Sequence, residues 1–151
     1  MNTQFTITNF NRKCILAIAK ELSQEQLNTI PTGFKNNIIW NIGHTIVTQQ
    51  LLVYKLSGLP CLISDETIAN YGKGSTAKTN LTEKETTELL DNLLVLSATM
   101  EADYKAGKFN TYNNYTTSLG FELTDVEKAI QFSNYHEGIH LGIIMAIKKL
   151  V

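Results

Sequence analysis

Residues 124–147, TDVEKAIQFSNYHEGIHLGIIMAI, decide the fold of this chain. Thr124 and Glu127 have the three-residue spacing of a capping box, which predicts a helix that begins here, at Asp125. Beyond it, apolar residues and two histidines recur at three- and four-residue spacing, as one face of a helix requires. This face carries Ala129, Phe132, His136, His140, Ile143 and Ile147. We therefore expect an amphipathic helix from Asp125 nearly to the C-terminus, packed through that face against other helices.

The same periodicity predicts three more helices earlier in the chain. They run from about Asn9 to Leu22, from about Asn36 to Ser57, and from a second capping box at Thr82 until Gly107. Gly58 and then Pro60 end the middle one, because glycine tolerates positive φ and proline blocks propagation. Four long amphipathic helices most simply form a four-helix bundle. We predict an all-α fold with one domain over residues 1–151.

Two long connections separate these helices, at residues 59–81 and 109–123. The first is irregular, with a short helix expected between Asp65 and Tyr71. The second is rich in Tyr, Thr and Asn, and we expect an ordered polar loop that packs its aromatic rings back onto the bundle. Connections of this length in a single domain usually have a function or cover something.

Composition restricts the partners and the compartment. The 151 residues include 13 basic and 14 acidic ones, for a net charge of -1 without a Lys/Arg cluster, so a nucleic acid is not expected as a partner. The apolar runs fall short of the roughly 20 residues that cross a bilayer, and residues 1–7 lack the pattern of a secretory signal. Cys14 and Cys61 are isolated thiols, expected as small hydrophobes that are buried or half-buried. We expect a cytoplasmic protein that does not bind a membrane.

The chain has three histidines, and all of them lie in predicted core helices. His136 and His140 are four residues apart, so their side chains project from one helix face and can converge on one ion. His44 lies on the second predicted helix, and metal sites in bundles are often built from facing helices. Each histidine alone would more often be a hydrogen-bonded core residue. Together they predict a three-histidine metal site.

The string His136-Glu137-Gly138-Ile139-His140 also matches the H-E-x-x-H pattern of zinc proteases. A zinc endopeptidase is nevertheless disfavoured, because the residues after His140 contain no His, Asp or Glu for a third ligand. Glu137 is a candidate general base beside the ion. The alternative is an ordinary solvated helix charge, since Glu137 lies about 100° round the helix from His136.

Polar residues near the histidines could accept the second N–H of a metal-bound imidazole. Asn41 and Thr48 share a helical strip with His44, and Ser133 lies one turn before the histidine pair. Asn37 continues the strip, but for this residue ordinary helix capping or exposure to solvent is favoured over a role at the site.

Three glycines lie beside the histidines: Gly43, Gly138 and Gly142. Glycine weakens a helix by about 1 kcal/mol relative to alanine. We interpret these glycines as points where backbones approach closely and leave room for an ion or a ligand. Trp40 is expected in the core.

These residues resemble the DinB-like superfamily of bacterial four-helix proteins. The resemblance rests on Trp40-Asn41-Ile42-Gly43-His44, on the loop before a long third helix, and on His136-x-x-x-His140 with Gly142 two residues on. It covers nearly the whole chain. It implies a divalent ion, commonly zinc or nickel, held by His44, His136 and His140, and a homodimer. Characterised members include transferases and isomerases that use low-molecular-weight bacterial thiols.

Two hypotheses about function follow from the predicted site. Three imidazoles leave at least one coordination position open, which favours a metal-dependent thiol S-transferase or hydrolase acting on a small molecule. The alternative is a non-catalytic, metal-stabilised bundle that serves in a stress response or as an interaction module. Imidazole must be neutral to bind a metal, so its reference pKa of about 6.5 predicts that metal affinity falls as the pH drops through that value.

Overall fold

The structure is a computed structural model that describes residues 1–151. It is mostly helical, which confirms the predicted all-α class. The six α-helices are α1 (Asn2–Lys20), α2 (Gln24–Asn28), α3 (Ile38–Gln49), α4 (Asp65–Tyr71), α5 (Glu83–Lys105) and α6 (Val126–Ile147). A π-helical turn, η1 (Gln50–Tyr54), and a 3-10 turn, η2 (Lys55–Ser57), continue α3. Two short strands, β1 (Tyr115–Thr116) and β2 (Glu122–Leu123), pair antiparallel.

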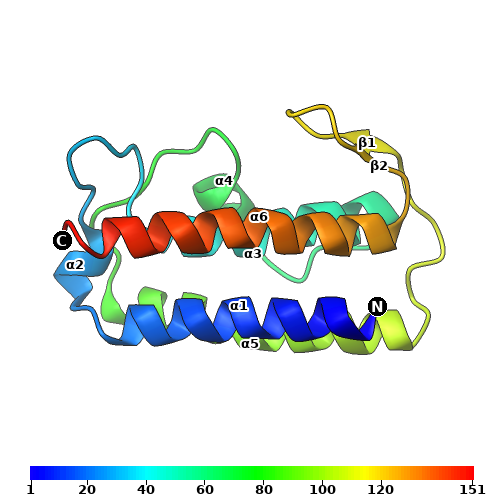
Figure 1. Ribbon diagram of the computed structural model, residues 1–151, viewed down its shortest axis with the longest axis horizontal. Coiled ribbons are helices and arrows are strands. Elements are labelled where there is room, and N and C mark those ends of the chain that lie inside the picture. The colour runs from blue at the N-terminus through cyan, green and yellow to red at the C-terminus, as the bar shows by residue number, and fades with distance from the viewer.

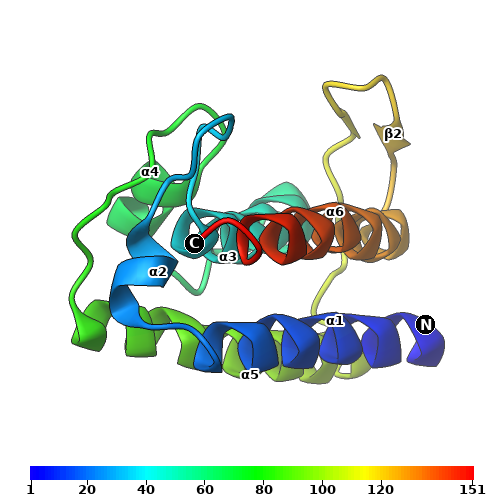
Figure 2. The same ribbon diagram turned by 60° about the vertical axis from the view of Figure 1, so that its left-hand side comes forward.

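The four long helices lie in two layers. α3 and α6 run side by side in one layer, and α1 and α5 form the other (Figure 1). α2 links the layers at one end of the molecule (Figure 2). α4 and the β-hairpin rise from the α3–α6 layer on the side away from α1 and α5, as both views show. The outer surface of the α3–α6 layer is therefore flanked by α4 at one end and by the hairpin at the other.

Aliphatic side chains from all four long helices fill the interior between the layers. Ile15 of α1, Ile42 of α3 and Leu93 of α5 are fully buried, as is Ile144 of α6. Each such side chain contributes about 1.5–3 kcal/mol through removal from water. This shared core holds α3 and α6 in fixed register.

Most of the predicted helix ends are confirmed. α4 has the predicted bounds, α5 begins with the capping box of Thr82 and Glu85, and Gly58 ends the helical segment with a φ of 72°. The predicted capping box of Thr124 and Glu127 is wrong. The N-cap of α6 is Asp125, whose side chain accepts from the Lys128 backbone N–H. Thr124 instead donates its hydroxyl to the carboxylate of Asp125.

The predicted start of the first helix, near Asn9, is also wrong, because α1 begins at Asn2. Tertiary contacts hold this extra segment, which has no side-chain cap. The side-chain amide of Asn134 in α6 donates to both the carbonyl and the side-chain oxygen of Gln4. Phe5 is 2% exposed. Packing against α6 therefore makes a helix where local capping signals are absent.

The connection before α6 differs from the predicted loop in containing the β-hairpin. Its strands have two residues each, too few for an alternating pattern to identify them. Aromatic rings do pack back at its start, as expected: the Tyr112 hydroxyl donates to the Leu52 carbonyl, and the Phe109 ring meets the edge of Tyr54. Phe121, farther along, is half exposed.

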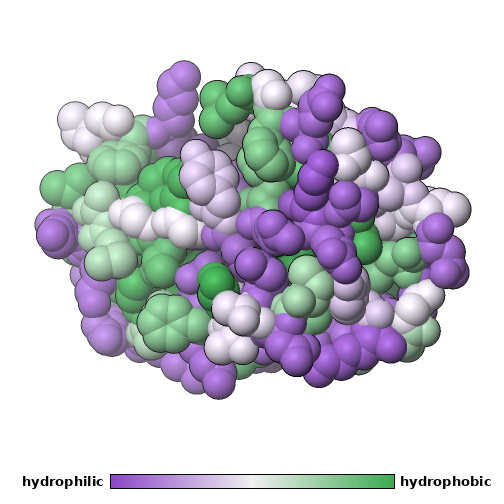
Figure 3. Space-filling view, turned by 45° about the vertical axis from the view of Figure 1, so that its right-hand side comes forward, coloured by the Kyte–Doolittle hydropathy of each residue, from purple (hydrophilic) through white to green (hydrophobic).

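Hydrophilic and apolar side chains are interspersed on the face seen in Figure 3. Cys14 and Cys61 are free and half-buried, as the sequence predicts. None of the helices combines the length and the apolar character needed to cross a membrane.

Candidate metal centre

The three histidines meet on the α3–α6 layer. His44 comes from α3, and His136 and His140 come from α6. One ring nitrogen of each lies within 4.8 Å of those of the other two. The ring centroids are 4.5 to 5.1 Å apart. The prediction that these residues from two helices converge is therefore confirmed.

A backbone carbonyl orients His44. Its Nδ1 lies 2.7 Å from the carbonyl oxygen of Tyr71, the last residue of α4. A carbonyl can only accept, so Nδ1 carries the proton and Nε2 keeps its lone pair. The ring of Trp40 stacks on His44 with centroids 4.5 Å apart. Trp40 is buried, as expected, and in addition forms a wall of the site.

Gly43 makes room for this arrangement. A Cβ atom at Gly43 would lie 2.4 Å from ring carbons of Tyr71, closer than carbon atoms can approach. The missing side chain lets the Tyr71 ring lie against α3, next to the carbonyl that His44 binds. Gly43 is therefore a point of close approach as predicted, but what approaches is the side-chain ring of Tyr71 and not another backbone.

Gly138 and Gly142 do not have this role. A Cβ at either position would meet no atom within 4 Å, and both residues are exposed. The prediction of close backbone approach is wrong for these two glycines, because they lie on the solvent side of α6.

A side-chain amide orients His140. Its Nδ1 lies 2.8 Å from Oδ1 of Asn41, while Nδ2 of Asn41 donates to the carbonyl of Asn37. Asn37 in turn caps α3 by accepting from the Trp40 backbone N–H, the capping role the sequence favoured. His140 therefore also donates through Nδ1 and keeps the lone pair on Nε2.

His136 is the least constrained of the three. Its Nε2 lies 3.2 Å from Nε2 of His140. Its Nδ1 is buried without a hydrogen-bond partner, and so is the hydroxyl of Ser133. Ser133 thus does not serve the imidazole as the sequence suggested. Thr48 does lie near the cluster, with its hydroxyl oxygen 3.5 Å from Nε2 of His44.

Burial lowers the pKa of all three imidazoles. Desolvation lowers the pKa of His136 to about 4 and that of His140 to about 3, and the neighbouring imidazoles add to both shifts. Desolvation also lowers the pKa of His44, although the hydrogen bond to the Tyr71 carbonyl opposes the change. All three rings are therefore neutral near pH 7, the form that binds a metal ion. Protons should therefore compete with a metal ion for these nitrogens at a pH below the value of about 6.5 that the reference pKa predicts.

The residues present fit a divalent transition metal ion. Neutral imidazole is a common ligand of zinc, nickel, iron and copper. Two nitrogens that share a tetrahedral ion at 2.0–2.1 Å lie roughly 3.3 Å apart, close to the 3.2 Å between His136 and His140. Two of the rings already donate their other N–H to fixed acceptors, as metal-bound histidines do.

Glu137 lies on the interior side of α6. It is 1% exposed, so its interpretation as a solvated helix charge is wrong. Its Oε1 accepts from Nε and Nη2 of Arg12 in α1 at 3.1 and 2.7 Å. Arg12 also donates to the carbonyl of Leu93 and to Oε1 of Gln49. The carboxylate therefore joins four helices through Arg12, and its role as a general base stays an untested prediction.

A cavity of about 200 Å³ adjoins the cluster. Two of the histidines, His44 and His136, line it together with the hydroxyl-bearing Thr48. Its other walls come from η1, from Lys73 after α4, and from the β-hairpin. A small molecule in this cavity would lie directly against the histidine side chains.

Sequence reasoning missed the Tyr71 carbonyl, Lys73 and the hairpin wall. A backbone acceptor has no residue-type signature, and Lys73 is one lysine among many. The glycine directly before His44 was the one usable signal, because it marks a close approach to α3.

Comparison with known proteins agrees with this geometry. A family model described as the DinB superfamily matches residues 8–144, which include all three histidines. The chain belongs to the DinB superfamily. A search of curated proteins found no match.

Proposed function

We propose that this protein binds one divalent metal ion, zinc or nickel, through His44, His136 and His140, within a four-helix bundle of the DinB type. The observation that carries the proposal is the pair of fixed tautomers. His44 and His140 both commit Nδ1 to an acceptor and leave Nε2 free beside the third ring. Core histidines that bind no ion would not need both rings to donate through Nδ1 and turn Nε2 toward the third ring.

We further propose that the site serves a reaction on a small molecule, either thiol S-transfer or hydrolysis. When bound, a divalent ion supplies Lewis acidity that lowers the pKa of a water or thiol toward neutrality. Support comes from the count of ligands: three protein donors leave a position open, whereas structural zinc usually has four.

The residues around such a site would have different roles. His44, His136 and His140 are neutral and supply no charge of their own. Trp40 covers one imidazole from the core side and excludes water there. Thr48 lines the cavity, and its hydroxyl, 3.5 Å from Nε2 of His44, is proposed to hydrogen bond to a polar group of the substrate.

The alternative is a non-catalytic bundle that the ion only stabilises, for a stress response or an interaction. One observation favours it: the hydrogen bonds of the site tie α4 to α3 through Tyr71 and α6 to α3 through Asn41. An ion held there would strengthen these same connections.

We also propose a cytoplasmic homodimer. The two free thiols, Cys14 and Cys61, suit a reducing compartment. Met145 and Gly142 are exposed one turn apart on α6, and we place the contact with a second copy there. A dimer would be measured by light scattering after size-exclusion chromatography, and Met145→Lys should shift it to monomer. A monomeric native protein would exclude this part of the proposal.

Elemental analysis of the untagged protein tests the metal site. We expect about one zinc or nickel ion per chain, and its loss in His44→Ala. The catalytic step is then tested with a small thiol and an aryl halide, where a C–S bond forms as the halide leaves, and with an activated ester in parallel. Turnover by the metal-loaded protein that is absent from His44→Ala supports catalysis. Background rates in both, together with a metal-dependent rise in Tm, would support the stabilised bundle instead.

A further inference from the structure

The cavity beside the histidines adjoins a second compartment beneath the β-hairpin, with which it shares lining residues. This compartment has a volume of about 380 Å³ and lies between the hairpin and α6. Leu119, Phe132 and Tyr135 line both cavities. Together the two compartments fall within the roughly 300–1,000 Å³ that small-molecule sites occupy.

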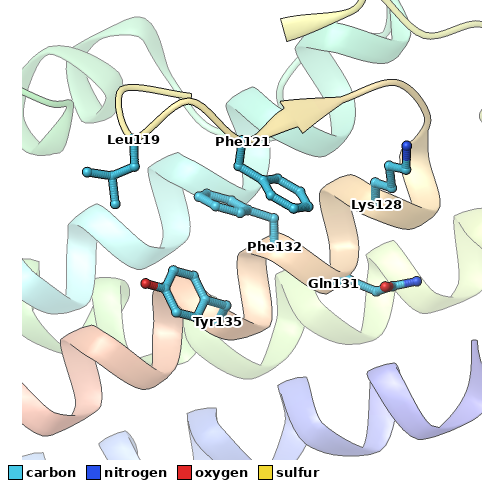
Figure 4. Close-up of a pocket in the computed structure, with 6 residues that line it drawn as sticks. All are labelled: Leu119, Phe121, Lys128, Gln131, Phe132 and Tyr135. Carbon is cyan, nitrogen blue, oxygen red and sulfur yellow. The ribbon is translucent and has the colours of Figure 1, made fainter. Parts of the chain in front are cut away.

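Aromatic side chains dominate the outer compartment. Phe121 of the hairpin and Phe132 of α6 stack with centroids 5.6 Å apart and an interplanar angle of 17°. Figure 4 shows Phe121 and Leu119 reaching from the hairpin toward Phe132 and Tyr135 on α6. Leu119 is 80% exposed and Tyr135 57% exposed, so both leave apolar surface open to solvent beside this compartment. A flat apolar group that covered it would gain about 25 cal/mol per Å².

The hairpin presents these side chains in a defined shape. Thr117 closes the turn, since its backbone N–H donates to the carbonyl of Phe121 and its hydroxyl accepts from the Phe121 N–H. Gly120 supplies the positive φ of 85° that the turn needs. Leu123 anchors the second strand in the core and is fully buried. The wall of the outer compartment is thus built before a ligand arrives.

Each compartment has one lysine in its lining: Lys73 beside the histidines, and Lys128 in the outer compartment, where its Nζ donates to the hydroxyl of Thr124. Neither compartment has an Asp or Glu in its lining. Lys73 lies at the histidine end and forms no ion pair. Three neutral imidazoles would leave the charge of a divalent ion uncompensated there. This end therefore favours an anionic group.

We propose that these two adjoining compartments together bind one small molecule with an aromatic ring and a carboxylate-type anionic group, the ring against Phe121 and Phe132, the anion beside Lys73 and the histidines. This ligand would be the substrate of the proposed three-histidine site. The orientation of the ligand, with its anionic group toward the histidines, rests on that proposed function. The cleft itself is formed by residues outside the histidine cluster.

Isothermal titration calorimetry with naphthalene-carboxylate and its neutral analogue, naphthalene-carboxamide, tests the proposal. Both probes should bind the native protein, with the carboxylate tighter. Phe121→Ser should weaken both probes about tenfold, because it removes the stacking surface. Lys73→Gln should weaken only the carboxylate, by about threefold to tenfold. Phe10→Ser and Lys84→Gln, exposed changes on α1 and α5, are the matched controls and should leave both affinities unchanged.

The measurements are made on chelator-treated and on metal-loaded protein. Absence of binding by both probes, or an equal loss in Phe10→Ser and Phe121→Ser, overturns the proposal. An effect of Lys73→Gln that is the same for both probes overturns the anionic part. Stoichiometric metal without probe binding means that the cleft assignment alone fails. If the probes bind in the expected pattern but elemental analysis finds no metal in the native protein, the cleft is supported and the proposed metal function is excluded.

Discussion

Asn41 and His140 are joined side chain to side chain, with Oδ1 of the amide 2.8 Å from Nδ1 of the imidazole. The amide cannot turn over without losing the bond from its Nδ2 to the carbonyl of Asn37. Its oxygen therefore stays toward the ring, and His140 is held with the lone pair of Nε2 directed at the other histidines. One amide thus links the cap of α3 to the tautomer of a candidate ligand.

Asn41→Ala should therefore weaken metal binding without removing a ligand. Loss of such a supporting hydrogen bond typically costs about 10–100-fold in affinity, because the ring is no longer held in orientation and tautomer. Competition with a chromophoric chelator measures the change. Asn134→Ala is the matched control, since Asn134 is also buried, on α6, but bonds to Gln4 and Thr8 of α1. An equal loss of affinity in both variants would mean that the effect is one of general stability.

Gly43→Ala should destabilise the protein and weaken the metal site together. The added Cβ would lie 2.4 Å from the Tyr71 ring, so this ring must move, and we expect the end of α4 and the carbonyl that binds His44 to move with it. Overpacking of this kind costs about 1–3 kcal/mol of unfolding free energy. Urea denaturation and chelator competition measure the two effects.

Gly138→Ala is the opposite case on a neighbouring helix. Its Cβ would meet no atom within 4 Å, so the higher helix propensity of alanine should stabilise the protein by about 0.5–1 kcal/mol. Metal affinity should not change. If Gly43→Ala proved as stable as the native protein, the close packing of Tyr71 on α3 would be refuted.

The sequence was sufficient for features that depend on local signals. The bounds of α4, the capping box at Thr82 and the stop at Gly58 follow from residue types at fixed spacing. The meeting of the three histidines followed from one i, i+4 pair and from the expectation that long amphipathic helices pack together.

Features that depend on tertiary contacts could not be predicted in the same way. The first residues of α1 are held by Asn134, far along the chain, and the hairpin strands are too short to have a pattern. From the sequence alone Glu137 is interpreted as a surface residue, because its buried partner Arg12 is far away in the chain. Identical residue types, such as Gly43 and Gly142, have different roles because only one faces a neighbouring ring.

The Arg12–Glu137 pair should matter for folding rather than for metal binding. Arg12 is fully buried and Glu137 nearly so, and removal of one partner leaves the other charge buried alone. Arg12→Met should therefore cost about 3–5 kcal/mol of unfolding free energy. The double variant Arg12→Met with Glu137→Leu should recover most of this loss, because both charges are then gone. Urea denaturation of the single and double variants measures the difference.

Glu137→Gln separates this structural role from proton transfer. The amide keeps the shape and an oxygen acceptor for Arg12, so the metal-loaded variant should retain turnover in proportion to its folded fraction. A turnover loss of about 100-fold or more in a fully folded variant would restore the general-base interpretation.

Acid should destabilise the chelator-treated protein before any carboxylate titrates. In the unfolded chain the histidines take up protons as the pH falls through about 6.5. In the folded protein, burial keeps the pKa of His136 at about 4 and that of His140 at about 3, so the unfolded state binds more protons below pH 6.5. Stability then falls with pH by up to about 1.4 kcal/mol per unit for each such histidine. Urea denaturation at several pH values between about 7 and 4.5 measures the slope.

His136→Gln is the internal control for that slope, because glutamine has no proton to gain. The variant should lose stability less steeply over the same range, by about one histidine's contribution. The lowered pKa values of Asp103, Asp125 and Glu85 remove stability as the pH falls toward and below their unfolded values of 3.8, 3.8 and 4.5, so they add to the slope only at the acid end of this window, and the histidine contribution is read above about pH 5.5. Metal-loaded protein should resist acid further, since an ion that binds only the neutral, folded site stabilises it by mass action. Equal slopes in the native protein and His136→Gln would mean that His136 titrates normally and is open to water.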